Sequence, residues 1–144
     1  MEQVRERVVV GVDGSEHAAR ALQWATRHAG PAQVEVVAAW TLFDQLHHGE
    51  FDPEWNEAKA KEFVDGFVDA TLGADRPDDL IITVINDLPT AAILSRAKEA
   101  DWVVVGSRGR GGFSGLVLGS VSSQVVHHAG CPVAVVPGPP ADKH

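Results

Sequence analysis

Two segments of the chain place glycine, hydroxyl and charged side chains directly after a run of β-branched residues. The first begins at the end of the run over residues 7–12 and reads Gly11-Val12-Asp13-Gly14-Ser15. The second runs from Gly106 to Ser120, with glycines throughout and with Arg108 and Arg110 among them. Glycines let backbone N–H groups converge on an anion, and arginines add charge-assisted donors, so this composition suits a phosphate group. A flexible surface loop has a similar composition, and composition alone leaves the two interpretations nearly equal.

Buried strands alternate with helices along the chain. Apolar, β-branched runs predict five strands, and segments with helical spacing and capping residues predict four helices between them. This order predicts an α/β fold, an open parallel five-stranded sheet with helices on both faces. In such sheets ligands bind beyond the carboxyl ends of the strands, where both segments above lie. The expected strands are 7–12, 34–40, 80–85, 102–105 and 132–136, and the expected helices begin after Ser15, at Asp52-Pro53-Glu54, at Pro89 and at Ser120.

Length and composition indicate one globular domain that needs no disulfide or metal ion for stability. A chain of 144 residues can bury about 68–70% of the surface that its unfolded form exposes. The net charge of −8 disfavours binding to nucleic acid or to an anionic membrane. Cys131 is the only cysteine, which excludes an intramolecular disulfide, and we assign it no redox role. The first apolar run is too short for a signal peptide, so we expect a cytoplasmic protein. We also expect an ordered core over about residues 5–137 and a flexible tail over residues 138–144.

Other kinds of chemistry have little support in the sequence. The P-loop motif is absent because no lysine lies between Lys98 and Lys143, and a dinucleotide motif would need glycine where Ser114 stands. His47 and His48 are adjacent in a polar stretch, which favours a solvated loop over a metal site. No Ser–His–acid spacing is evident, so we predict no catalytic residue.

Spacing over the whole chain resembles that of the universal stress protein family. The segment from Gly106 to Ser120 matches the G-2x-G-9x-G-[S/T] signature of the branch of that family that binds ATP. The valine-rich first strand with residues 11–15 is also similar, and so is the run from Gly119 to Val136. The resemblance covers roughly residues 5–137. It implies a Rossmann-like fold of the adenine nucleotide alpha hydrolase type.

The resemblance also implies an ATP site, occupied together with Mg²⁺. Asp13, flanked by Gly11 and Val12, would lie against the ribose, and Ala39 with Trp40 would lie against the adenine. The glycine-rich segment would wrap the phosphates, and the start of the last helix would complete the cradle. Two of these residues have structural alternatives, Trp40 as a core residue at a strand end and Asp13 as an Asx-turn residue. The full set is Gly11, Val12, Asp13, Ala39, Trp40, Gly106, Ser107, Arg108, Gly109, Arg110, Gly111, Gly112, Gly119, Ser120 and Val121.

Function and assembly follow from the same resemblance. It implies a nucleotide-binding module in stress response signalling, with a slow ATPase or autophosphorylating enzyme as the alternative and an interaction protein with an empty cleft as a third possibility. Members of the family are typically homodimers that pair through the last strand, here Val133–Val136. An apolar edge strand is a liability unless it is paired, which gives the same expectation. Asp87 departs from the family, which commonly has glycine there, and is expected either to cap the helix at Pro89 or to face the cleft.

Overall fold

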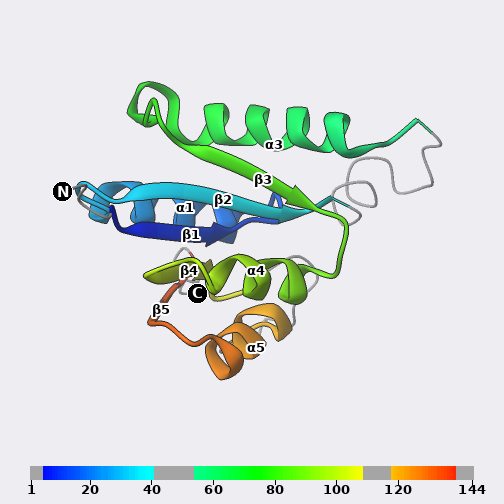
Figure 1. Cartoon of the computed structure of the whole chain (residues 1–144). Helices are drawn as coiled ribbons and strands as arrows, with labels where there is room; N and C mark the ends of the chain where they lie inside the picture. Colours follow the sequence, from blue (N-terminus) through cyan, green and yellow to red (C-terminus); the bar gives the residue numbers. More distant parts are fainter. Residues whose placement is uncertain (1–4, 41–53, 109–117, 139–144) are drawn as a thin grey trace, which may run out of the picture.

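The computed structural model describes residues 5–40, 54–108 and 118–138, and it contains a five-stranded parallel sheet with helices on both faces (Figure 1). The strand order is β3-β2-β1-β4-β5, so the order reverses between β1 and β4. The predicted fold class is confirmed. The strands are β1 (Arg7–Gly11), β2 (Gln33–Ala39), β3 (Ile81–Ile85), β4 (Trp102–Gly106) and β5 (Val133–Val136), and the helices are α1 (Glu16–His28), α3 (Glu57–Leu72), α4 (Pro89–Ala97) and α5 (Ser120–His128), with a 3-10 turn η1 (Gly73–Asp75) after α3.

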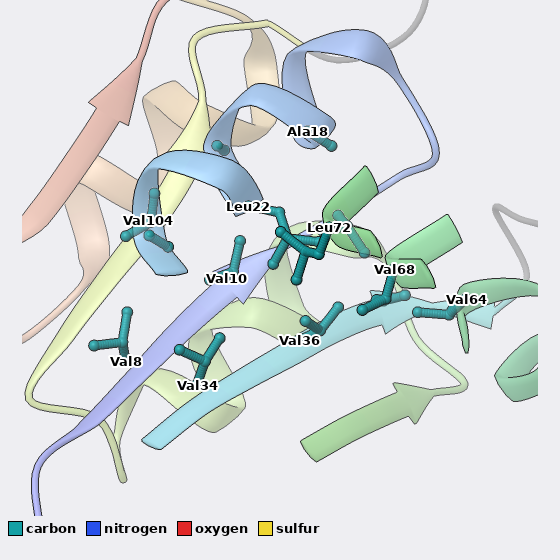
Figure 2. Packing of buried hydrophobic residues seen from close by; sticks show 14 of the residues in the cluster. Val8, Val10, Ala18, Leu22, Val34, Val36, Val64, Val68, Leu72 and Val104 are labelled. Carbon is teal, nitrogen blue, oxygen red and sulfur yellow. The ribbon is translucent and has the colours of Figure 1, made fainter. Parts of the chain in front are cut away.

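Each face of the sheet carries its own apolar core. On the face of α1 and α3, Val8 and Val10 of β1 pack with Leu22 of α1 (Figure 2). On the face of α4 and α5, Val9 of β1 packs with Ile93 of α4. Successive residues of a strand point to opposite faces, so a strand covered on both faces is apolar at nearly every position. This is why the strands are visible in the sequence as continuous apolar runs. Within the described ranges no helix is both long and apolar enough to cross a membrane.

Helix starts follow the predicted capping residues in α1 but not in α3. The Ser15 hydroxyl oxygen accepts a hydrogen bond from the Ala18 N–H at 3.1 Å, as expected for an N-cap. The predicted start of the next helix at Asp52 is wrong. That residue lies outside the described ranges, and α3 begins after Asn56, whose side-chain oxygen accepts from the Lys59 N–H at 2.9 Å. Asn and Asp cap helices equally well, so the sequence does not distinguish the two candidates.

One carboxylate is buried between the sheet and α4. Glu35 of β2 is only 1% exposed. Its Oε2 accepts hydrogen bonds from Thr83 Oγ1 of β3 at 2.6 Å and from Arg96 Nε of α4 at 2.9 Å, and a guanidinium nitrogen of Arg7 lies 3.6 Å from Oε1. The hydrogen bond to Glu35 raises the pKa of Arg96. This cluster ties β1, β2 and β3 to the last turn of α4.

Cys131 is expected to react slowly with alkylating reagents. Its Sγ lies 3.9 Å from the Ala97 carbonyl oxygen. Burial raises the pKa of the thiol, and Asp101 adds to that effect, so less of the reactive thiolate is present at a given pH. At pH 8 we expect native protein to react with iodoacetamide more slowly than glutathione, and protein in guanidinium chloride to match glutathione. A native rate as fast as that of glutathione would contradict the shift.

Candidate functional site

A cleft that is open to solvent lies at the carboxyl ends of β1 and β4, and the space it encloses is about 50 Å³. This is the end of the sheet toward which the β1 arrowhead points in Figure 1. Strand order reverses here, and this is where ligands bind in open α/β sheets. The cleft therefore lies where the sequence predicted a site. The described residues that line it are Gly11, Val12, Asp13, Ala18, Pro89, Ile93, Val105, Gly106, Arg108, Val121 and Ser122.

A tight turn brings the chain from β1 into α1 along one side of the cleft. The Asp13 carboxylate accepts a hydrogen bond from the Ser15 N–H at 2.9 Å. Gly14 has a φ of 82°, in the left-handed region that favours glycine. The structural alternative for Asp13, an Asx turn, is therefore present. Asp13 lines the cleft at the same time.

Two glycines let helices approach the strand ends closely. A Cβ atom on Gly11 would lie 2.9 Å from Ile93 Cγ1 of α4, and a Cβ atom on Gly106 would lie 2.8 Å from the backbone oxygen of His17 in α1. Real Cβ atoms essentially never make contacts this short. Any other residue at Gly106 would displace the backbone of α1, and any other residue at Gly11 would force the Ile93 side chain of α4 to move. The two glycines therefore set how closely both helices border the cleft.

The glycine-rich segment leaves β4 and enters α5 beside one carbonyl group, that of Ser107. The Ser107 carbonyl oxygen accepts a hydrogen bond from the Gly119 N–H at 2.7 Å, and the Ser107 N–H donates to the Val136 carbonyl at 2.8 Å. The Ser122 hydroxyl donates to the same Ser107 carbonyl at 2.8 Å. Through Ser107, these contacts join the residues that follow β4 to the start of α5 and to the end of β5.

The structure gathers some of the predicted site residues and separates others. Ser107 and Gly119 are buried and Ser120 is exposed at the start of α5, and none of the three is among the lining residues. Ala39 is buried in the core under α4, and neither it nor Trp40 is among the lining residues. The predicted residues that do line the cleft are Gly11, Val12, Asp13, Gly106, Arg108 and Val121. Outside the described ranges lie Gly109, Arg110, Gly111 and Gly112.

Trp40 and Asp87 each have a local structural role. Trp40 packs against the core on the α3 side, and its carbonyl oxygen accepts a hydrogen bond from the Trp55 indole N–H at 2.9 Å. The core interpretation therefore describes Trp40. Asp87 is exposed, and its carboxylate accepts from the Leu88 N–H at 2.7 Å. Leu88 is the N-cap residue of α4, so Asp87 bonds the residue before the helix and is absent from the described cleft lining.

Sequence reasoning missed part of the cleft wall. Pro89 and Ile93 of α4, and Ser122 of α5, line the cleft but were not predicted as site residues. Pro89 and Ile93 belong to a helix far from both glycine-containing segments in the sequence, and only the parallel crossover brings them there. Ser122 lies two residues beyond the end of the G-2x-G-9x-G-[S/T] signature, and nothing in its sequence position distinguishes it from Ser120 and Ser123.

Comparison with known proteins agrees with this architecture. A model described as the universal stress protein family matches residues 5–137. Universal stress protein Rv2005c of Mycobacterium tuberculosis is 33% identical over 141 residues, which cover 90% of this chain and 47% of that protein. Universal stress protein Rv1996 of the same organism is 36% identical over 145 residues, which cover 93% of this chain and 45% of that protein.

Among solved structures, a universal stress protein in complex with cAMP is 25% identical, with a TM-score of 0.66, and the match covers 93% of this chain and 98% of that one. The chain spans about half the length of the curated relatives it matches. The family model, in contrast, matches nearly all of it. On this evidence the chain belongs to the universal stress protein family.

Proposed function

We propose that this chain is a nucleotide-binding module that holds ATP in the cleft at the ends of β1 and β4. The observation that carries the proposal is the meeting of the two segments that the sequence singled out. Asp13 comes from the first, Gly106 and Arg108 come from the second, and all three line one cleft at the reversal of strand order. This is where open α/β sheets bind nucleotides.

The chemistry of the cleft wall suits the two ends of an adenine nucleotide. Pro89, Ile93 and Val105 form an apolar wall that can take a purine ring. Arg108 supplies a guanidinium group for phosphate oxygens, and α5 begins beside it. The N-terminus of a helix favours an anion through its unpaired N–H groups and its dipole. A relative of this chain binds cAMP, which belongs to the same class of ligand.

Magnesium fits the proposal as a companion of the phosphates. The described part of the chain has no group of three or more His, Cys, Asp or Glu side chains placed to hold a metal ion. Mg²⁺ is commonly held by one or two carboxylates together with substrate phosphates and water. In this cleft Asp13 is the one carboxylate among the described lining residues. We therefore expect Mg²⁺ to bind with ATP and not before it.

Binding without turnover is the form of the function that the cleft favours. Among its described lining residues, Asp13 is the only carboxylate that could act as a general base. One oxygen of that carboxylate already accepts the Ser15 N–H at 2.9 Å, so the Asx turn engages it before any ligand binds. In this proposal the signal in stress response is the occupancy of the cleft, and hydrolysis of ATP is not required.

The proposed assembly is a homodimer that pairs through β5. In the described part of the chain, β5 pairs with β4 on one side only, and Val133, Ala134 and Val135 are partly exposed. An edge strand of this composition tends to pair with another strand. The curated relatives are about twice as long as this chain, which leaves room in each for a second domain of this size. A cytoplasmic dimer is the arrangement we propose.

The first experiment identifies nucleotide released from freshly purified protein and measures ATP affinity by calorimetry. Asp13→Asn keeps the acceptor of the Asx turn but removes the negative charge, so we expect ATP affinity to fall about tenfold or more because a charge-assisted hydrogen bond is lost. Asp87→Asn is the matched control, because Asp87 also accepts from a backbone N–H but lies off the cleft. Unchanged affinity in Asp13→Asn would refute the assignment of Asp13. Absence of ATP binding by the wild type at millimolar concentration would refute the proposed function.

A further inference from the structure

The two described arms of the glycine-rich segment are joined by a buried serine. One arm is Gly106–Arg108, which leaves β4, and the other is Gly119–Val121, which enters α5. Ser122 follows the second arm, is only 3% exposed, and lines the cleft. Its hydroxyl oxygen lies 2.8 Å from the Ser107 carbonyl oxygen and 3.1 Å from the Gly119 carbonyl oxygen. Ser122 therefore contacts both arms at once.

The hydroxyl of Ser122 has one proton, and the shorter contact is the one that crosses to the other arm. That proton and the Gly119 N–H occupy the two lone pairs of the Ser107 carbonyl oxygen. Without the hydroxyl, a single hydrogen bond would join Ser107 to the second arm. The Ser122 contact is thus half of the described hydrogen bonding between the arms at this carbonyl.

The separation of the two arms decides which groups can reach one phosphate chain. Arg108 follows Ser107 directly and lines the cleft, and Val121 lines it from the second arm. Groups that bind one anion from two sides bind it more tightly when the fold holds them in fixed positions before the ligand arrives. We infer that Ser122 is a positioning residue that holds the two arms at the separation needed to bind the phosphates of ATP. This inference rests on the proposed function.

The neighbouring serine offers an internal comparison. Ser123 lies one position further along α5 and is exposed. Ser123→Ala also removes one serine hydroxyl from α5, but it leaves the hydrogen bond from Ser122 to the Ser107 carbonyl in place. It should therefore leave ATP affinity unchanged.

The test measures the affinities of the full chain for ATP and for adenosine, which has no phosphate. For Ser122→Ala we expect the Kd for ATP to rise about threefold to tenfold, as for the loss of one buried hydrogen bond. The Kd for adenosine should stay within twofold of the wild-type value. Both dissociation constants are measured at a temperature below the thermal unfolding midpoint of the ligand-free variant, so that the protein is folded. If the alanine variant does not fold, Ser122→Cys takes its place, because cysteine is close to serine in size and is only a weak donor. It should also weaken the binding of ATP and leave the binding of adenosine unchanged.

Each outcome separates this inference from the function on which it rests. The inference is supported if Ser122→Ala weakens the binding of ATP but not of adenosine, and if Ser123→Ala weakens neither. An equal loss for ATP and adenosine would mean that Ser122 supports the fold in general, and the inference would be overturned. Unchanged ATP affinity would overturn it as well. A wild-type chain that binds neither ligand would instead overturn the proposed function.

Discussion

Replacing Arg96 with alanine is expected to lower the free energy of unfolding by about 3–5 kcal/mol, which is the usual cost of leaving one partner of a buried ion pair alone. Glu35 would remain in a site where its side chain is 2% exposed. Thr83 would still donate to it at 2.6 Å, but the nearest remaining cation, on Arg7, lies 3.6 Å away. A buried carboxylate with weaker compensation destabilises the folded state. Urea unfolding at neutral pH measures the loss.

Arg76 provides a matched control for this prediction. It forms ion pairs at 2.7 Å with Asp65 and Asp69, so its pairing distances are as short as that of Arg96. The two aspartate side chains are 50% and 62% exposed, and exposed pairs contribute about 0–1 kcal/mol. Arg76→Ala removes two such pairs and should therefore cost less than about 2 kcal/mol. Equal losses in the two variants would show that burial of the carboxylate is not the deciding factor.

A double variant separates the cost of an unpaired charge from the contribution of the pair. Replacing both Glu35 and Arg96 with methionine removes the buried charge together with its partner. Substitution of a whole buried ion pair by apolar residues of similar volume is often close to neutral. We therefore expect Glu35→Met with Arg96→Met to be more stable than Arg96→Ala. A double variant that is no more stable than the single one would indicate that the pair itself stabilises the fold.

The order of strands and helices was predictable because both faces of the sheet are covered. Strands such as β1 and β2 then contain apolar residues on both faces, and their runs stand out from the polar helix surfaces. Glu35 is an exception inside such a run. Its burial depends on Arg96, which lies 61 residues further along the chain, and no local pattern signals that pairing.

The lining of the candidate cleft was predictable where it depends on local spacing and not where it depends on tertiary contacts. Asp13 and Arg108 line the cleft because each follows the end of a strand at the reversal of strand order. Trp40 also follows a strand, but its carbonyl accepts from the Trp55 indole N–H and its partly buried ring packs against the core. The contribution of Ile93 depends on how closely α4 approaches Gly11. The distance between α4 and Gly11 depends on tertiary packing, and no local sequence pattern predicts it.

Replacing Gly106 with alanine is expected to destabilise the fold by about 1–3 kcal/mol, the range for overpacking, and to weaken ATP binding. The new Cβ atom would lie 2.8 Å from the backbone oxygen of His17 and 2.9 Å from its carbonyl carbon. Backbone atoms in the first turns of α1 cannot move away by rotation of a side chain. The start of α1 must shift instead, and the turn that contains Asp13 shifts with it.

Gly11 offers the contrasting case, because a Cβ atom there meets a side chain. The nearest atoms belong to the Ile93 side chain, with Cγ1 at 2.9 Å. Ile93→Val removes the terminal methyl group and should recover part of the stability that Gly11→Ala loses. The same Ile93→Val change should recover nothing in Gly106→Ala, because its obstacle is backbone. Urea unfolding of the two glycine variants, each with and without Ile93→Val, measures this difference. Equal recovery in both would show that the two glycines do not meet different obstacles, and the account of how α1 and α4 border the cleft would be wrong.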